Sequence, residues 1–247
     1  MSDIQVSLTP AQMEIFNSPA RFKVAACGRR FGKSYLAAWT LLIKGLESQS
    51  KDIFYIAPTF QQAKDILWGL LKDLGRDVIK STHENTATIT LINGRKIYLK
   101  GSDRPDTLRG VGLAYVVMDE YAFMKPSVFE QIIRPTLADV KGEALFIGTP
   151  EGRNHFYDLY VAAQDDDEWE VFSFNSTDNP LIDPKEIEVA RRSMSSQAFR
   201  QEFEASFESF SGGIFKDEWF ETSKEPDYGH YIVSVDPAGF EQSSKDR

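Results

Sequence analysis

The sequence predicts an α/β fold in which a mainly parallel sheet is covered by helices on both faces. Two observations lead to this prediction. Short, continuously apolar runs alternate with amphipathic helical segments through most of the chain, and strands buried on both faces are typical of parallel sheets. Glycine-containing or acidic turns follow several of these runs, as expected where strands of such a sheet meet helices.

The first predicted elements flank a glycine-containing loop. Thr9 is suited to cap a short helix that has Pro10 at its first position. Residues 22–26 form an apolar strand that runs into the loop CGRRFGKS, and a helix follows over residues 33–46.

The middle of the chain continues the alternation. ATITLI and KIYLKG flank Asn93-Gly94, which is a strong hairpin signal. The remaining segments divide by their hydrophobic pattern into strands over residues 53–58, 114–119 and 144–150, and helices over residues 60–74 and 126–139.

The chain divides into three parts. Residues 1–175 carry the strand–helix alternation. Residues 176–227 lack an apolar strand and predict a small helical subdomain and linker, with one helix entered through Asp183-Pro184. Residues 228–247 contain a fresh apolar strand, YIVSVDPAG, which ends at Asp236. Because one strand cannot form a sheet alone, we expect the chain to stop just inside a second domain.

Composition excludes several classes. The 247 residues, 42% of them hydrophobic, suffice for a large core, whereas no apolar run is long enough for a membrane span and the N-terminus lacks a signal-peptide pattern. The single cysteine excludes an internal disulfide framework, and the three histidines offer no zinc-ligand spacing. The net charge of −9 means that any contact with nucleic acid must be a local patch.

The loop from Cys27 to Ser34 has the character of a phosphate-binding loop. Gly28 and Gly32 leave the backbone N–H groups free to wrap phosphates, Lys33 supplies a cation for the β and γ oxygens, and Ser34 supplies a hydroxyl for Mg²⁺. Cys27 stands where the usual motif has its first glycine. The alternative is an ordinary strand–turn–helix with a surface lysine.

Arg29 and Arg30 lie inside this loop. Either side chain has the length to reach the γ-phosphate of the nucleotide or to sense its departure, because an arginine supplied in cis is a known catalytic device. The alternative is that both are solvated or paired with a neighbouring carboxylate.

The strand AYVVMD ends in an acidic pair. Asp119 is suited to hold Mg²⁺ together with Ser34, and Glu120 to polarise the attacking water. Thr149, in the turn IGTPEG after the next strand, is placed to contact the γ-phosphate region or Glu120. For the acidic pair, the alternative is that it only marks a strand leaving the core. For Thr149, the alternative is a plain strand-end turn. Together the loop and the pair predict a P-loop NTPase that binds ATP with Mg²⁺.

Two further groups of side chains have weaker signals. The amide of Gln12, ahead of the loop, has a donor and an acceptor that match an adenine edge, although a surface glutamine on an amphipathic helix gives the same pattern. A local cationic cluster around the hairpin predicts a DNA contact, and a solvated hairpin face explains it equally well; its members are Arg95, Lys96, Lys100 and Arg104.

In combination these features resemble the ATPase domain of the large terminase subunits of tailed bacteriophages. The resemblance rests on GRRFGKS, IFYIAPT with QQAKD, GSDRPDTLRG, VVMDEYAF, IGTPEG, and DNPLIDPKEIEVAR followed by FRQEFEASF. It implies a motor that hydrolyses ATP to move double-stranded DNA into a viral capsid. It also implies a ring of subunits on the capsid portal, a small terminase subunit as partner, and work in the host cytoplasm outside the finished virion. For residues 228–247 it implies the start of a ribonuclease-H-like nuclease, with Asp236 as a metal ligand.

Arg109 lies in RPDTLRGVG, the loop before the acidic strand. If this loop enters the sheet at the edge opposite the acids, Arg109 lies about 30 Å from its own site, at about 3.3 Å per strand residue. We therefore expect Arg109 to act in trans on the nucleotide of a neighbouring subunit, and the resemblance points the same way. The alternative is local pairing with Asp103 or Asp106.

Two other functions fit the same motifs. A helicase or translocase related to superfamily 2 would continue into a second nucleotide-binding domain, whereas this chain continues into SVDPAG. A nucleotide-switched DNA-binding module would bind ATP without appreciable hydrolysis, and it has no need of the water-activating Glu120.

Overall fold

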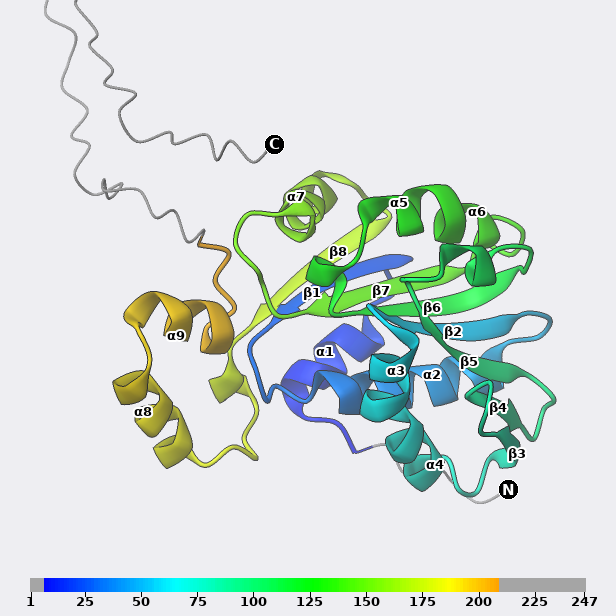
Figure 1. Cartoon of the computed structure of the whole chain (residues 1–247), viewed down its shortest axis with the longest axis horizontal. Coiled ribbons are helices and arrows are strands. Elements are labelled where there is room, and N and C mark those ends of the chain that lie inside the picture. The colour runs from blue at the N-terminus through cyan, green and yellow to red at the C-terminus, as the bar shows by residue number, and fades with distance from the viewer. Residues whose placement is uncertain (1–6, 209–247) are drawn as a thin grey trace, which may run out of the picture. The chain divides into compact units, whose positions relative to one another are not determined.

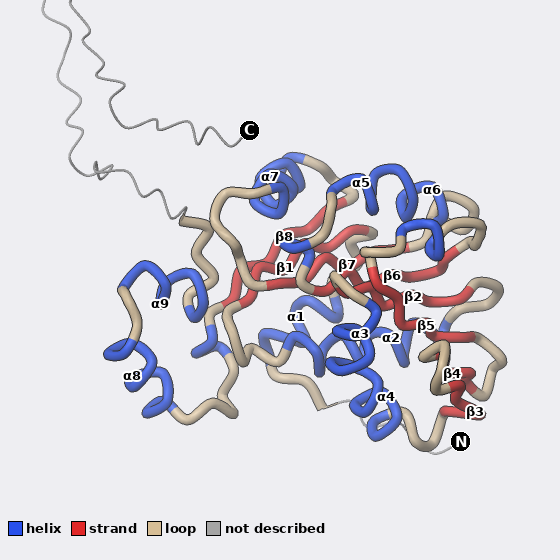
Figure 2. The backbone as a smooth tube through the Cα atoms, in the orientation of Figure 1, coloured by secondary structure: helices blue, strands red, loops and turns tan. Residues whose placement is uncertain are grey.

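The computed structural model describes residues 7–208 and has at its centre an eight-stranded sheet with the order β3-β4-β5-β2-β6-β7-β1-β8 (Figures 1 and 2). Strands β2, β5, β6, β7, β1 and β8 pair in parallel, and the two antiparallel pairs are β3 with β4 and β4 with β5. The strands are β1 (Phe22–Cys27), β2 (Asp52–Ala57), β3 (Ile79–His83), β4 (Thr88–Leu91), β5 (Lys96–Gly101), β6 (Leu113–Asp119), β7 (Glu143–Gly148) and β8 (Trp169–Phe174).

Helices cover both faces of the sheet (Figure 1). One layer packs α1 to α4 and the turn η1 against one face, and the other packs α5 to α7 and the turn η4 against the opposite face. The first layer contains α1 (Pro10–Asn17), α2 (Lys33–Glu47), α3 (Phe60–Ala63), the π-helical turn η1 (Lys64–Trp68) and α4 (Gly69–Leu74). The second contains α5 (Pro126–Val128), the π-helical turn η4 (Phe129–Ile133), α6 (Arg134–Thr136) and α7 (His155–Ala162).

Four short 3₁₀ turns and two helices complete the described part. The turns are η2 (Pro105–Leu108), η3 (Tyr121–Phe123), η5 (Ala163–Asp165) and η6 (Ser176–Asp178). The two helices, α8 (Pro184–Ser193) and α9 (Ser196–Phe203), form a hairpin beyond the end of β8. Each begins with a side-chain cap, from Asp183 and Ser195 respectively.

The mainly parallel α/β sheet predicted from the sequence is confirmed, and so are the hairpin at Asn93-Gly94 and the two helices of the small subdomain. Strands β3 and β8 were not predicted. The exposed side chains of Lys80 to His83 on β3 break the buried-strand pattern, and in β8 only Phe172 is buried. Both strands lie at sheet edges, where one side lacks a neighbouring strand and the hydrophobic signal is weak.

Two predictions lie wholly outside the described residues: the second domain over residues 228–247 and the metal ligand Asp236. Within residues 7–208, no helix has the length and apolar character that a membrane crossing requires.

Candidate functional site

Three neighbouring strands deliver the predicted chemical groups to one edge of the sheet. Strand β7 lies between β6 and β1, and the register pairs Asp119 with Ile147 and Ala26 with Gly148. The strand ends are therefore level. Since adjacent strands lie about 4.8 Å apart, the acidic pair and the glycine-containing loop are separated by about 10 Å, with Thr149 in the gap.

The loop between β1 and α2 has the backbone of a phosphate cradle. Gly32 caps α2 with φ of 95°, a left-handed conformation that glycine adopts readily, and Arg30 has φ of 60°. Lys33 and Ser34 open the helix, where the unpaired N–H groups and the helix dipole favour an anion. The backbone therefore supplies what a triphosphate requires.

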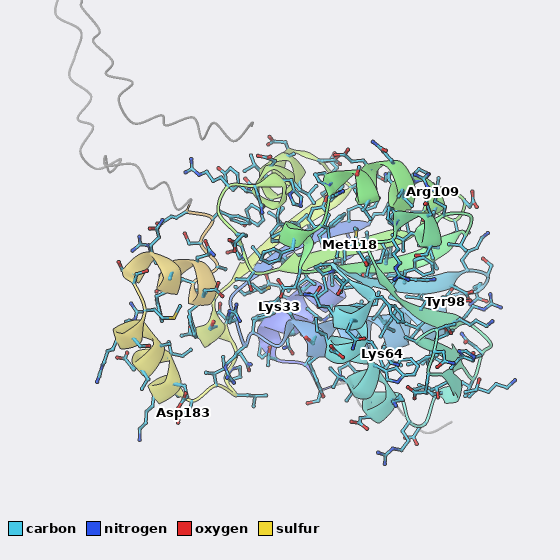
Figure 3. All side chains as sticks on the ribbon, viewed as in Figure 1. Lys33, Lys64, Tyr98, Arg109, Met118 and Asp183 are labelled. Atoms are coloured by element: carbon cyan, nitrogen blue, oxygen red, sulfur yellow. The ribbon has the colours of Figure 1, made fainter. Side chains whose placement is uncertain are left out.

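Lys33 lies at the centre of the site (Figure 3). Its ammonium donates hydrogen bonds to the carbonyl oxygens of Cys27 and Gly28, at 3.2 and 3.3 Å, and to the hydroxyl of Thr149, at 2.8 Å. Its charge also reaches the carboxylates of Asp119 and Glu120, where it acts to lower their pKa values. The structure thus brings together the predicted lysine, threonine and acidic pair.

The acidic pair is held in a strained and buried setting. Asp119 is 2% exposed, and its carboxylate accepts hydrogen bonds from the Tyr55 hydroxyl at 2.5 Å and the Glu120 backbone N–H at 2.9 Å. Glu120 has φ of 53° and ψ of 45°, a left-handed conformation that costs a non-glycine residue about 1–2 kcal/mol. Such strain clusters at functional sites, because it fixes the direction of a side chain.

Burial raises the pKa values of both carboxyl groups, and for Glu120 the charge of Asp119 raises the pKa further. A hydrogen bond from the Thr149 backbone and the charges of Lys33 and Arg29 act in the opposite direction on Glu120. A carboxylate with a raised pKa is a better proton acceptor than an exposed one.

Lys33, Glu120 and Thr149 face a cavity of about 1110 Å³, large enough for a nucleotide. It extends from the loop across the strand ends to the helical hairpin. Its lining includes Arg29, Arg30, Gly32, Lys33, Ser34, Tyr35, Pro58, Gln62, Leu70, Glu120, Phe123, Thr149, Glu151, Met194, Glu202 and Phe203.

One wall of this cavity comes from the helical hairpin. The carboxylate of Glu202 on α9 pairs with the guanidinium of Arg29, and the Glu202 carbonyl accepts the Arg29 backbone N–H at 2.6 Å. Ser176 and Asn179 donate side-chain hydrogen bonds to the carbonyl oxygens of Arg29 and Arg30, at 2.6 and 2.7 Å. The loop and the hairpin are thus joined by direct hydrogen bonds.

Sequence reasoning missed this wall. Glu202 and Phe203 lie in α9, and Met194 follows the end of α8. Their segments predicted helices but no site, and only the return of the chain past β8 brings them to the loop. Tyr55 was also missed, although an internal tyrosine in an otherwise apolar strand is a signal for a buried polar partner.

The predicted arginines have separate surroundings. Arg29 pairs with Glu202, in agreement with the alternative prediction that a loop arginine pairs with a neighbouring carboxylate. The Arg29 side chain is 67% exposed. Arg30 lines the same cavity. The structure therefore places both side chains on the lining of this cavity.

Gln12 is 3% exposed rather than on the surface. Its amide nitrogen donates to the Phe31 carbonyl at 3.0 Å, and its amide oxygen accepts the Thr9 backbone N–H at 3.0 Å. A second cavity, of about 500 Å³, opens beside it and is lined by Ser7, Leu8, Thr9, Pro10, Gln12, Gly32, Tyr35, Asn179, Pro180 and Leu181. Gln12 thus joins α1 to the loop at the edge of a mostly apolar cavity.

Arg109 lies away from Lys33 (Figure 3). It follows η2, at the end of β6 opposite Asp119, and its side chain is 55% exposed and 3.8 Å from the Asp106 carboxylate. Arg109 therefore lies at the strand end opposite the acids, and its contact with Asp106 is the local pairing named as the alternative.

The cationic cluster follows β5. Lys96 and Lys100 lie within the strand, while Arg95 precedes it and Arg104 lies in the loop after it. The guanidinium of Arg95 donates to the Ser50 carbonyl at 2.7 Å.

The residues proposed for Mg²⁺ have suitable chemistry. Mg²⁺ prefers a few hard oxygen ligands and keeps waters and substrate phosphates for the rest. Asp119 supplies a carboxylate and Ser34 a hydroxyl at the same edge of the sheet. Residues 7–208 contain no cluster of three or more histidine, cysteine or acidic side chains that would hold a metal without a substrate.

Comparison with known proteins decides the family. Residues 25–222 match the family described as terminase large subunit, T4likevirus-type, N-terminal. The chain belongs to the terminase large subunit family. The matched range contains the phosphate loop, the acidic pair and the helical hairpin.

Curated relatives agree with this membership. The large terminase subunit of Escherichia phage T5 is 36% identical over 205 residues, which cover 79% of this chain and 46% of that protein. The chain spans about half the length of the curated terminase subunits that it matches.

Solved terminases share the fold. The large terminase ATPase domain of Thermus phage P74-26 superposes with a TM-score of 0.72 at 26% identity, over 81% of this chain and 94% of that domain. A large terminase of a thermophilic bacteriophage, solved with ATP-gamma-S, superposes with a TM-score of 0.70 at 17% identity, over 82% of this chain and 53% of that protein; this likeness shows the fold alone. The P-loop type of α/β fold is thus confirmed.

Proposed function

We propose that this terminase domain hydrolyses ATP and that the hydrolysis drives double-stranded DNA into a viral capsid. The observation that carries the proposal is the convergence of the phosphate loop, Thr149 and Glu120 on one cavity, with Lys33 bonded to Thr149 and Asp119 buried beside Glu120. The solved ATPase domain of Thermus phage P74-26, which matches 81% of this chain, supports it.

The chemistry follows from the positions of the side chains. ATP lies with its phosphates along residues 28–34, where the backbone N–H groups and Lys33 balance the negative charge. Glu120 accepts a proton from water as the water oxygen attacks the γ-phosphorus, the bond from that phosphorus to the bridging oxygen breaks, and ADP and phosphate leave. Asp119 and Ser34 would hold Mg²⁺, which would supply positive charge to offset the charge of the phosphates.

The loop arginines have a role in the same reaction. Arg29 lies on the cavity and is paired with Glu202. We propose that Arg29 or Arg30 moves to the γ-phosphate when ATP binds. Since phosphoryl transfer spreads negative charge over three oxygens, a guanidinium there stabilises the transition state.

The cavity beside Gln12 is proposed as the place of the adenine. Its mostly apolar walls suit a planar base, and Gln12 is one of the polar groups in its lining. Gln12→Ala is expected to weaken ATP binding more than binding of inorganic triphosphate. If Gln12→Ala weakened the binding of ATP and of triphosphate equally, the role of Gln12 would be limited to holding the loop against α1.

The partners are proposed for the whole protein, because this chain spans about half the length of its curated relatives. We propose a ring of subunits on the capsid portal, with a small terminase subunit as a further partner, at work in the host cytoplasm and absent from the finished virion. For residues 228–247 we propose the beginning of a nuclease domain, with Asp236 as its first metal ligand. Purified chain is accordingly expected to leave plasmid DNA uncut in Mn²⁺, because two-metal cleavage requires several ligands.

Steady-state phosphate release with MgATP tests the central proposal. Lys33→Ala is expected to remove binding or turnover, while Lys80→Ala, on the exposed edge strand β3, retains both. Unchanged turnover in Lys33→Ala would contradict the proposal. Glu120→Gln separates hydrolysis from a nucleotide switch, because a switch that only binds ATP retains its function without this acid.

A further inference from the structure

One part of the sheet, strands β3, β4 and β5, has α-helices on a single face. The α-helices that contact β5 are α2 and α3, both in the first layer, whereas the short 3₁₀ turn η2 contacts β5 from the other side. The side chains under these helices are buried and apolar: Ile89, Leu91, Ile97 and Leu99. The opposite face of β4 and β5 carries Thr88, Thr90, Lys96, Tyr98 and Lys100, which alternate with the apolar set. Thr88 is buried, Lys96 is exposed, and the other three are half-buried.

We call these five residues the open face. In Figure 1, helices α5 and α6 lie over β6 and β7 and leave β3 and β4 uncovered. A half-exposed sheet face with hydroxyls, lysines and one aromatic ring is far more polar than the faces that the helices cover. Burial against another helix therefore does not explain its composition.

Lys100 is the unusual member of the open face. Its ammonium lies 5.6 Å from the ring centroids of both Phe54 and Tyr98. Within residues 7–208 no carboxylate lies within ion-pair distance of it. Partial burial lowers the pKa of Lys100, because the charged form loses solvent. The fold thus holds a cation against two aromatic rings without an acidic partner.

A small cavity of about 150 Å³ adjoins this cation. Its lining joins the open face to the loop after η2 and consists of Asp52, Phe54, Tyr98, Lys100, Thr107, Val111 and Gly112. The carboxylate of Asp52 accepts the Lys96 backbone N–H at 2.9 Å, which directs it toward the strand. The pocket therefore presents a positioned cation at the margin of the open face, while the Thr107 hydroxyl in its lining donates to the Arg104 carbonyl at 2.8 Å.

Geometry favours an extended polyanion over a small ligand. Lys96 and Lys100 point to the same side of β5 and are about 13 Å apart along the strand, at about 3.3 Å per residue. Arg104 follows β5 in the loop before η2. The hydroxyl of Thr90, which pairs with Lys96 in the register, is of a kind that commonly bonds phosphate oxygens.

The contacts of Tyr98 decide between two kinds of nucleic acid. Lys100 covers its ring, and Phe54 packs edge-on against it at 5.6 Å and 72°. A single-stranded partner binds mainly by stacking bases on free aromatic faces, and this ring is not free. Contact through phosphates, without base recognition, suits a duplex.

We propose that the open face binds the sugar–phosphate backbone of duplex DNA, with Lys96 and Lys100 as its phosphate contacts. The choice of DNA rests on the proposed packaging function. Arg95 is excluded from the contact, although it belongs to the same sequence cluster, because its guanidinium bonds Ser50 at the turn.

The test measures fluorescence anisotropy of a labelled 30-base-pair duplex (about three helical turns) with the whole chain and without nucleotide, from about 50 to 200 mM salt. Lys96→Gln and Lys100→Gln are each expected to weaken binding several-fold and to reduce the slope of log affinity against log salt by about 1. Arg95→Gln is the matched control and is expected to bind as the parent does.

Three outcomes would overturn the proposal. The parent chain does not bind the duplex at about 50 mM salt, or Lys100→Gln binds with the same salt slope as the parent. The third is that Arg95→Gln loses as much duplex affinity as the lysine variants do. A larger loss for oligothymidine than for duplex in Tyr98→Leu would instead assign the face to single strands. Melting temperature and DNA-free ATP turnover of each variant report on folding. Because binding is measured without nucleotide, failure here is distinguishable from failure of the ATPase proposal.

Discussion

The ammonium of Lys33 donates a 2.8 Å hydrogen bond to the hydroxyl of Thr149, although 116 positions separate the two residues in the sequence. Thr149 also bonds Glu120 through its backbone, which acts to lower the pKa of that carboxyl. A single residue at the end of β7 therefore contacts both the lysine proposed to bind phosphate and the proposed base.

This double contact predicts a selective defect in Thr149→Val. The variant retains the shape and the backbone contact but loses the acceptor for Lys33. Since hydrogen bonds to charged groups contribute about 1.5–3 kcal/mol, we expect turnover to fall about tenfold or more. Phosphate-release kinetics measure it, and Thr149→Ser, which keeps the hydroxyl, is expected to stay within about threefold of the parent.

The buried acidic pair predicts an unusual dependence on pH. The folded-state pKa of Glu120 lies above its ordinary value of 4.5. Its contribution to stability is therefore present below the unfolded-state pKa and is lost as the pH rises through the folded-state pKa. Glu120→Gln cannot ionise, so its melting temperature is expected to exceed the parent's by an amount that grows as the pH rises toward neutrality.

ATPase activity is expected to depend on pH in the opposite direction to stability. The proposed base acts as a carboxylate, so turnover of the parent is expected to fall on acidification at a pH above 4.5, and Glu120→Gln is expected to lose about 10²–10⁴ in rate. Thermal melts and rate profiles over the same buffers measure both effects. A variant that melts below the parent at neutral pH would contradict the assignment of a strained, functional carboxylate.

The sequence was sufficient to predict these central elements because each carries a local signal. Lys33 and Ser34 follow a glycine at a strand-to-helix junction, and Asp119-Glu120 end a wholly apolar strand. Parallel strands align their carboxyl ends, so the convergence of both groups could be predicted without coordinates. The wall at Glu202 could not, because its place depends on how the chain folds back after β8 rather than on any local pattern.

Close packing at this wall predicts a sensitive glycine. A Cβ atom at Gly28 would lie 2.6 Å from the Phe203 carbonyl oxygen and 2.8 Å from the Ser176 nitrogen, both backbone atoms. Gly28→Ala is therefore expected to separate the loop from α9, lower the melting temperature by several degrees and reduce ATP turnover. Differential scanning fluorimetry and phosphate release measure the two effects.

Gly69 provides the matched control. A Cβ atom there would meet no atom within 4 Å, and the position lies in a helical segment. Gly69→Ala is expected to stabilise the fold by about 0.5–1 kcal/mol, since alanine loses less backbone entropy than glycine. If Gly28→Ala were as stable and active as Gly69→Ala, the contact between loop and hairpin would have no energetic consequence.

The position of Arg109 yields a prediction about assembly. The residue lies before β6, at the end opposite Asp119, and its side chain is 55% exposed with only a 3.8 Å contact to the exposed carboxylate of Asp106. Such surface pairs contribute about 0–1 kcal/mol, so the guanidinium is readily released. If it completes the site of a neighbouring subunit, specific ATPase activity is expected to rise with protein concentration, and Arg109→Ala to remove that rise while ATP affinity stays nearly unchanged.

A mixing experiment separates this trans role from a local one. Arg109→Ala has an intact phosphate loop, and Lys33→Ala has an intact arginine. At a contact between the two variants, the arginine of the second can act on the nucleotide of the first, so the mixture is expected to regain activity that neither variant has alone. An effect in trans is expected to be large, because an arginine finger changes phosphoryl-transfer rates by about 10³–10⁵. Asp106→Asn is the control, since it removes the local pair and leaves the guanidinium in place. A mixture without recovery, or a parent whose specific activity is the same at every dilution, would assign Arg109 to its local pair with Asp106.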